Sequence, residues 1–285
     1  MSPVESGPPY RTMKWRCLDR TLDLSRRGGI MGIVNVTPDS FSDGGLFATV
    51  DAAAEQAKRL IEEGAALIDI GGESTRPGAA EVDEAEELRR VLPVISRLAA
   101  EGPDTILSID TCKAGVAAAA VASGARVIND VRGFRDAEMV EVAAASGAGL
   151  VVMHMRGTPR TMQVDPVYTD LHGEITTFFR ERLEALLAAG VAEESVVFDP
   201  GIGFGKTLDH NLAILRELDR YTVNGRPILL GVSRKSFLAK VTGSDRPEDR
   251  AWGTVAITSH AREQGVRLHR VHEVKPNLEA LRMTE

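Results

Sequence analysis

TILSIDTCKAGVAAAAVASGARVIND, residues 105–130, contains two short β-branched runs on either side of an Ala-rich segment. The runs Thr105–Asp110 and Arg126–Asp130 are predicted to be strands. The segment between them ends at Gly124, the residue type that helices favour just past their last turn. Continuous apolar strands joined by helices are typical of parallel sheets covered on both faces. This stretch therefore predicts an α/β fold.

The same strand–helix pattern recurs along the whole chain. Six further strands are predicted, at Ile30–Asn35, Ala66–Ile70, Leu150–His154, Ser195–Asp199, Pro227–Val232 and Arg267–Val271. Eight such units predict a (β/α)8 TIM barrel, a single domain over residues 30–285. Residues 1–29 are expected to form a short N-terminal flap or hairpin that covers the barrel bottom. An open, doubly wound sheet is the alternative, because the pattern alone does not show that the sheet closes.

The composition narrows the class of protein. The 285 residues include 34 basic and 41 acidic side chains, a formal charge of −7, which disfavours a nucleic-acid surface. The two cysteines, Cys17 and Cys112, have no metal-ligand spacing and are expected to be reduced thiols. The N-terminus lacks the apolar core of a signal peptide, and no run is apolar enough to span a bilayer. We therefore expect a cytoplasmic protein without a membrane partner.

Polar or charged residues stand at the end of every predicted strand. In chain order these are Asn35, Asp69, Asp110, the pair Asn129–Asp130, His154, Asp199, the triplet at 233–235 and the triplet at 270–272. Because polar residues end all eight predicted strands, they indicate a binding or catalytic site at the C-terminal end of a barrel. Helix capping could explain Asp130 or Ser74 instead, but it does not explain Lys235.

The chemistry of these residues divides into two groups. Asp110, Asn129, Asp199 and Lys235 offer the acceptors and donors that suit a flat, nitrogen-rich heterocycle. The second group is mostly cationic and suits phosphate oxygens: Asn35, Arg76, Arg270 and His272. The sequence thus predicts a heterocycle and a phosphate or diphosphate bound close together.

Three weaker signals are interpreted without a catalytic role. GIGFGKT, residues 201–207, lacks the first glycine of a phosphate-binding P-loop, and its glycines are expected to let the backbone approach a ligand. His269 is expected to be a packed or surface histidine, while His154 is balanced between core packing and ligand contact. Glu84, Glu86 and Glu87 are expected on a solvated helix face.

Eight motifs together resemble the dihydropteroate synthase family. They are MGIVNVTPDSFSDGG, IDIGGESTRPGA, SIDT, VINDV, MHMRGTPRTMQ, DPGIGFGKT, GVSRKSF and RVHEV, in that family's order over residues 31–274. The resemblance implies a TIM barrel, usually a homodimer, and a transferase of folate biosynthesis that is the target of sulfonamides. The implied reaction condenses 6-hydroxymethyl-7,8-dihydropterin diphosphate with 4-aminobenzoate to 7,8-dihydropteroate, and releases diphosphate with the assistance of Mg²⁺.

The resemblance also implies roles for individual residues. The pterin diphosphate would contact Thr75, Asp110, Asn129, Met153, Asp199, Phe204, Lys235, Arg270 and His272. The 4-aminobenzoate would contact Phe41, Thr75, Pro77 and Ser233. The catalytic set would be Asp39, Phe41, Asp43, Arg76 and Lys235, and Asn35 would be associated with the metal. One departure is Glu273, where Asp is usual in the family.

The implied mechanism is dissociative. Mg²⁺ and the cationic group would stabilise the departing diphosphate, and the aniline nitrogen would attack a cation delocalised into the dihydropterin ring. Asp39 and Asp43 would place negative charge near that cation, and Phe41 would cover the aminobenzoate ring. Two alternatives remain: a pterin-binding barrel of the methyltransferase type that handles methyl-tetrahydrofolate, and a pterin-binding protein without catalysis. The diphosphate and aminobenzoate motifs argue against the first, and the intact cationic group against the second.

Overall fold

The computed structural model describes residues 12–37, 45–74, 81–158, 162, 166–243 and 246–285. Eight parallel strands form its centre, and they match the eight predicted runs. They are β3 (Gly29–Asn35), β4 (Leu67–Gly71), β5 (Ile106–Asp110), β6 (Val127–Asp130), β7 (Gly149–Met153), β8 (Val196–Asp199), β9 (Leu229–Leu230) and β10 (Leu268–Val271). The prediction of eight barrel strands is confirmed.

The strand order shows that the sheet closes into a barrel. The neighbours run β8, β7, β6, β5, β4, β3, β10 and β9, each pair parallel. The last gap is spanned by a parallel bridge between Phe198 and Ile228, and Phe198 N donates to Pro227 O at 3.1 Å. The chain is therefore a TIM barrel, and the doubly wound alternative is excluded.

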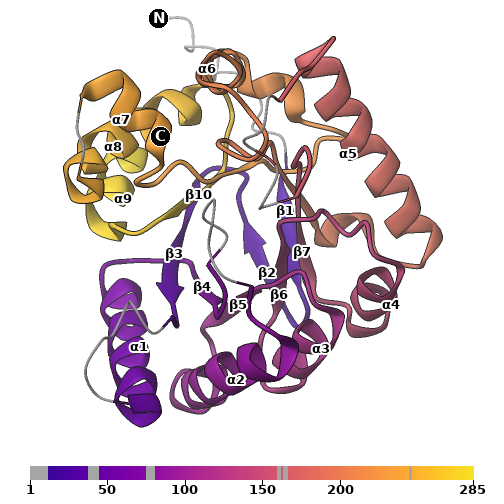
Figure 1. Cartoon of the computed structure of the whole chain (residues 1–285), viewed down its shortest axis with the longest axis vertical. Coiled ribbons are helices and arrows are strands. Elements are labelled where there is room, and N and C mark those ends of the chain that lie inside the picture. The colour runs from indigo at the N-terminus through magenta and orange to yellow at the C-terminus, as the bar shows by residue number, and fades with distance from the viewer. Residues whose placement is uncertain (1–11, 38–44, 75–80, 159–161, 163–165, 244–245) are drawn as a thin grey trace, which may run out of the picture.

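Helices surround the barrel and cover its outer face (Figure 1). They are α1 (Gly45–Glu62), α2 (Glu84–Glu101), α3 (Ala114–Ala122), α4 (Ala137–Ser146), α5 (Leu171–Ala188), α6 (Leu208–Arg216), α7 (Ser236–Thr242), α8 (Ala251–Glu263) and α9 (Val274–Met283). Short 3-10 helices lie at Glu193–Ser195, Leu218–Tyr221 and Pro247–Arg250. None of the described helices combines the length and the hydrophobicity needed to cross a membrane.

Successive strand residues face two separate apolar layers. Ile68 and Ile128 belong to the large layer between the strands and the helices. Their chain neighbours Leu67 and Val127 belong to a smaller layer inside the barrel. This alternation is the period of two that a β-strand imposes, with both faces buried. It explains why the strands appear in the sequence as continuous apolar runs.

An antiparallel hairpin precedes the first barrel strand. It consists of β1 (Lys14–Cys17) and β2 (Arg20–Asp23). Trp15 is fully buried in the inner barrel layer, and its Nε1 donates to the backbone oxygen of Ser195 at 2.8 Å. Because Ser195 directly precedes β8, the hairpin lies at the N-terminal end of the strands. The C-terminal end, where the polar residues gather, is the opposite one.

Candidate active site

The register of the strands brings the predicted polar residues to one end of the barrel. Asn35 pairs with Gly71, Gly71 with Asp110, and Asp110 with Asn129, across β3 to β6. On the next strands Met153 pairs with Asp199. The remaining members lie on β10 or follow β9 and β10: Ser233, Lys235, Arg270 and His272. The strand ends therefore form a ring of polar groups, as the sequence predicted.

Arg270 links two carboxylates inside this ring. Its Nε donates to Oδ2 of Asp69 and its Nη2 to Oδ2 of Asp110, both at 2.6 Å. Asp69 is fully buried and also accepts from Asn129 Nδ2 at 3.0 Å and Ser108 Oγ at 2.5 Å. The guanidinium partly compensates the two buried negative charges, which would otherwise be unfavourable at this site. Asp69 is a functional candidate that the sequence reading left without a role.

Asp110 presents an unused acceptor. Its Oδ1 is buried and has no hydrogen-bond partner in the part of the chain that the structure describes. Burial raises the pKa of Asp110 to about 7, although the charge of Arg270 acts in the opposite direction. A buried acceptor without a partner is unfavourable, and a ligand N–H would satisfy it. This is the geometry expected of a residue that binds the edge of a heterocycle.

Asp199 and Lys235 are further polar members of the site. Oδ1 of Asp199 accepts from Gly201 N at 2.7 Å, and burial raises the pKa of this carboxyl. Burial lowers the pKa of Lys235 to about 8, while the charge of Asp199 opposes that shift. Lys235 Nζ lies 4.6 Å from the centre of the Phe204 ring, within the range of a cation–π interaction. It also donates to the backbone oxygen of Ile202.

An apolar cluster lies beside these charged groups. Val131, Met153, Met155 and Met162 are buried together, with Phe204 and Cys112 packed against them. Met153 and Phe204 come from the ends of neighbouring barrel strands, β7 and β8, or directly after them. A polarizable, apolar surface of this kind suits the face of a flat ring. The candidate site thus combines polar groups that suit a ring edge with apolar groups that suit a ring face.

Ser233 and His272 contact each other directly. The hydroxyl of Ser233 lies 2.9 Å from His272 Nδ1 and accepts from His272 N at 3.1 Å. The sequence reading assigned these two residues to different substrates. The contact therefore places the predicted aminobenzoate residue and the predicted diphosphate residue next to each other. A second link joins the same two loops, because Arg234 Nε donates to Glu273 Oε1 at 2.6 Å.

Lys206 and His154 support the loop after β8. Lys206 is buried, and its Nζ donates to Phe204 O at 3.0 Å and lies 3.1 Å from His154 Nδ1. Burial lowers the pKa of His154 to about 2, with Lys206 contributing. His154 is therefore a neutral packing residue, and of its two predicted roles the structure favours the first. His269 is buried as well, which agrees with a packed histidine.

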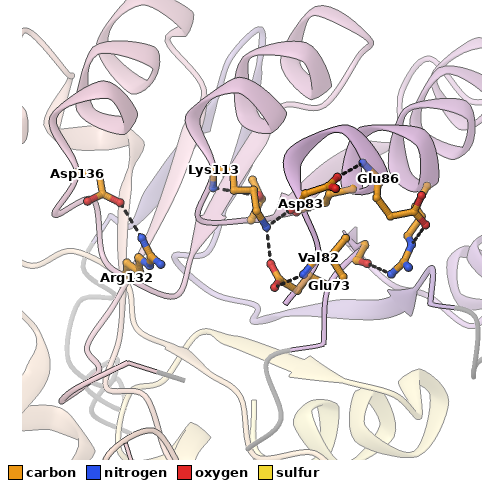
Figure 2. Close-up of polar contacts among 11 residues, drawn as sticks. Glu73, Val82, Asp83, Glu86, Lys113, Arg132 and Asp136 are labelled. Carbon is orange, nitrogen blue, oxygen red and sulfur yellow. Dashed lines mark hydrogen bonds and ion pairs between the residues drawn. The ribbon is translucent and has the colours of Figure 1, made fainter. Parts of the chain in front are cut away.

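A network of ion pairs lies at the base of the connection between β4 and α2 (Figure 2). Lys113 Nζ contacts Glu73 Oε2 at 2.5 Å and Glu87 Oε2 at 2.6 Å, while Glu73 Oε1 accepts from Val82 N at 3.1 Å. Lys113 thereby connects the end of β5 to residues on both sides of positions 75–80. The prediction that Glu87 is solvated was wrong, because this side chain is fully buried. Its charge is compensated by Lys113 rather than by water.

Six predicted site residues lie outside the described residues. They are Asp39, Phe41, Asp43, Thr75, Arg76 and Pro77. Their assignment to catalysis and to substrate binding remains a prediction.

Asn35 is the candidate metal-associated residue. Its Oδ1 and Oδ2 of Asp110 both lie near Gly71, within 3.9 Å of the position that a Cβ at Gly71 would take. Within the described ranges, no group of three or more His, Cys, Asp or Glu side chains could hold a metal ion. Magnesium often keeps several waters and binds through one or two protein oxygens plus substrate phosphates. The amide oxygen of Asn35 is an oxygen ligand of the type that such an ion accepts, whereas Oδ2 of Asp110 is occupied by Arg270.

Comparison with known proteins agrees with this geometry. Residues 31–272 match the family model described as pterin binding enzyme. Dihydropteroate synthase of Escherichia coli strain K12 is 42% identical over 273 residues, 96% of each chain. The Yersinia pestis dihydropteroate synthase in a sulfonamide drug complex has a TM-score of 0.89 at 46% identity, covering 95% of this chain and 98% of that one. The Xanthomonas albilineans dihydropteroate synthase with 4-aminobenzoic acid has a TM-score of 0.89 at 45% identity, covering 95% and 97%. The chain therefore belongs to the pterin-binding enzyme family and, within it, to the dihydropteroate synthases.

Proposed function

We propose that this transferase condenses 6-hydroxymethyl-7,8-dihydropterin diphosphate with 4-aminobenzoate to 7,8-dihydropteroate and releases diphosphate. The observation that carries the proposal is the set of acceptors at the ends of β5, β6 and β8, from Asp110, Asn129 and Asp199, with Lys235 beside them. A dihydropterin has a guanidine-like edge that donates several N–H groups, and a ring carbonyl that a lysine can bind. The names of the relatives favour this reaction over methyl transfer from a folate.

The aminobenzoate step is supported by the chemistry around Ser233. A serine hydroxyl can donate to a carboxylate, and Ser233 lies against His272, a candidate for the diphosphate site. The two substrates would then meet across a single contact between neighbouring loops. The 4-aminobenzoic acid and sulfonamide complexes of the relatives support the same assignment, and we propose that sulfonamides compete for this subsite.

The diphosphate would lie between β3 and β10. These two strands are paired; Asn35 is the last residue of β3, and His272 directly follows β10. The two residues therefore lie at the same end of neighbouring strands. We propose that Asn35 holds Mg²⁺ together with phosphate oxygens and water. When bound, the metal would neutralise charge on the departing diphosphate. His272 and Arg270 would orient the same group through charge-assisted hydrogen bonds.

The reaction we infer is a dissociative substitution. The bond between the pterin methylene carbon and the diphosphate oxygen breaks, and the electron pair leaves with the diphosphate. The aniline nitrogen of 4-aminobenzoate then forms the new bond to that carbon and loses a proton to solvent. Met153 and Phe204 would exclude water from one side of the ring while the carbon is cationic.

We also propose that the enzyme is a homodimer. Trp252 on α8 is 78% exposed and Val241 on α7 is 57% exposed, and these two helices contact each other. Large apolar side chains exposed on neighbouring helices often mark an interface. Light scattering coupled to gel filtration should give about twice the mass of the chain, and Trp252→Glu should give the monomer. A monomer for the unaltered protein would contradict the proposal.

The central experiment is a product assay. Purified protein is mixed with the pterin diphosphate, 4-aminobenzoate and Mg²⁺, and 7,8-dihydropteroate and diphosphate are measured in equal amounts. Lys235→Met should reduce kcat/KM at least about 10-fold, because a charged hydrogen bond contributes about 1.5–3 kcal/mol. Lys58→Met, a change on the outer surface of α1, should leave the rate unchanged. Folded protein that forms neither product would refute the proposed function.

A further inference from the structure

Asp69 is the centre of a hydrogen-bond network that joins four barrel strands. The residue lies on β4 and is fully buried. It accepts from Ser108 of β5 at 2.5 Å, from Asn129 of β6 at 3.0 Å and from Arg270 of β10 at 2.6 Å. Two of these donors, Asn129 and Arg270, belong to the candidate substrate site. Asp69 therefore acts on the site through its neighbours.

We propose that Asp69 is a positioning residue that decides which atoms of Asn129 and Arg270 face the substrate ring, and that it thereby selects a donor-rich heterocycle. This inference rests on the proposed function, since it concerns how the same pocket recognises a pterin. Asp69 acts as an acceptor at each of its three contacts, and it can therefore orient only groups that donate.

The orientation of the Asn129 amide follows from this. An asparagine amide has a donor end and an acceptor end, and rotation by half a turn exchanges them. Because Asp69 Oδ2 accepts from Nδ2 of Asn129, the donor end is held toward β4. The acceptor Oδ1 is then the end that remains for a ligand. Without the carboxylate of Asp69, nothing in this contact would prevent the opposite orientation.

The orientation of Arg270 is fixed in the same way. Its Nε and Nη2 are each bound to a carboxylate, from Asp69 and Asp110 respectively. Two contacts from a planar guanidinium define its plane, and lysine could not reproduce them. The same arrangement leaves Oδ1 of Asp110 without a hydrogen bond among the described residues. Asp69 thus helps to hold Arg270 in a position from which it binds Oδ2 of Asp110 but not Oδ1.

The combined result is a pocket edge made of acceptors. Oδ1 of Asn129, Oδ1 of Asp110 and the carboxylate of Asp199 would all accept from the ligand. A pterin offers an amino group and ring N–H donors at that edge, whereas lumazine has a carbonyl in place of the amino group. A site built to bind an N–H group discriminates strongly against an analogue that lacks it, because its buried acceptor is left unpaired.

The test compares the binding of pterin and lumazine to the full chain by calorimetry. The unaltered protein should bind pterin at least about 10-fold more tightly than lumazine. Asp69→Leu removes the oxygen that accepts from both Asn129 Nδ2 and Arg270 Nε, so neither group is held in its orientation. We expect this variant to bind pterin at least about 10-fold more weakly and to discriminate between the two ligands by less than about threefold.

Asp130→Leu is the matched control. Asp130 is also a buried carboxylate at a strand end, but its oxygens accept from the backbone N–H groups of Arg132 and Phe134, at 2.8 and 2.7 Å. The same substitution there should leave the ratio of the two affinities unchanged, even where it reduces stability. A loss of discrimination in the control as large as in Asp69→Leu would overturn the inference.

Asn129→Leu covers the case in which Asp69→Leu does not fold. It removes the amide and should reduce the discrimination between pterin and lumazine to the same level, less than about threefold. Unchanged discrimination in this variant would overturn the inference. A folded Asp69→Leu protein with the original affinity and ratio would overturn it as well, while leaving the proposed function intact. No binding of pterin by the unaltered chain would instead refute the proposed function, and the inference with it.

Discussion

Lys113 and Glu87 form an ion pair of 2.6 Å in which the glutamate is fully buried. The lysine also contacts Glu73, so one ammonium group compensates two carboxylates (Figure 2). Both glutamates raise the pKa of Lys113, and burial acts in the opposite direction. Lys113, at the start of α3, is thereby connected to α2 through Glu87. Through Glu73 it is also connected to the segment that follows β4. It is therefore a structural support for the connection that carries three of the predicted site residues.

Lys113→Met should destabilise the fold markedly. The substitution keeps the length of the side chain but leaves the carboxylate of Glu87 buried without a cation. Removing one partner of a buried pair costs about 3–5 kcal/mol. We expect the free energy of unfolding, measured by urea denaturation, to fall by about 3 kcal/mol. Lys58→Met is the control, since Lys58 also contacts two glutamates, Glu55 and Glu101, on the exposed surface. Its effect should stay below about 1 kcal/mol, and equal effects would contradict the argument.

The rate of the enzyme should depend on pH through two residues of the pocket. Burial raises the pKa of Asp110 to about 7 and lowers that of Lys235 to about 8. The reactive form has the carboxylate ionised, to accept N–H groups, and the lysine protonated, to donate. As pH falls through about 7, Asp110 gains a proton and kcat/KM should decrease. As pH rises through about 8, Lys235 loses its proton and kcat/KM should decrease again, which gives a bell-shaped profile.

Two variants separate the limbs of that profile. Asp110→Asn should lower kcat/KM and remove the decrease near pH 7, because the carboxyl with that pKa is absent and Asp199 is the carboxyl that remains. Lys235→Met should likewise remove the alkaline limb. Steady-state rates between pH 5.5 and 9.5 with the pterin diphosphate limiting would measure both. If either limb persists in the variant that lacks its residue, a different group is responsible.

The parts of the site that the sequence predicts are those that end strands. Asp110 and Asp199 each end a short β-branched run, and a parallel barrel gathers all such ends at one face. Predicting that these side chains lie together requires only the positions of the strands in the sequence and their parallel direction. Local residue types and their order were therefore sufficient for the barrel and for this group of side chains.

The parts that the sequence did not predict depend on contacts between distant segments. Asp69 accepts a hydrogen bond from Arg270, which lies 201 positions further along the chain. Nothing in the sequence around Asp69 distinguishes it from another carboxylate at the end of a strand. Glu87 follows a run of acidic residues on a helix, and its burial depends on Lys113 from the next unit. The predicted strand Pro227–Val232 is reduced to Leu229–Leu230, because only these residues pair with β10. Pairing and burial of this kind are properties of the assembled barrel.

Glu273→Ala should weaken the link between the two loops that carry Ser233 and His272. Arg234 has a φ of +57°, an unfavourable conformation for a residue other than glycine, and its guanidinium is ion-paired with Glu273. Without the glutamate we expect KM for 4-aminobenzoate to rise about twofold to 10-fold, since an intramolecular hydrogen bond contributes about 0.5–1.5 kcal/mol. Glu273→Asp, the residue usual in the family, should remain within about twofold. A larger loss in Glu273→Asp than in Glu273→Ala would contradict this role.

Trp15→Ala should lower the stability of the fold without changing the binding of substrates. Trp15 is fully buried inside the N-terminal end of the barrel, with its indole nitrogen bound to Ser195 O. Truncation of a buried tryptophan costs about 3–5 kcal/mol, through the lost apolar contacts and the cavity that remains. Because the hairpin lies at the end opposite the site, KM for both substrates should stay within about twofold in the folded variant. Trp15→Phe is the control: it keeps most of the volume but loses the hydrogen bond, and should cost about 1 kcal/mol beyond the small change in packing. Urea denaturation and steady-state kinetics on the same preparations would measure both effects, and a large rise in KM with unchanged stability would show that the hairpin acts on the site rather than on the fold.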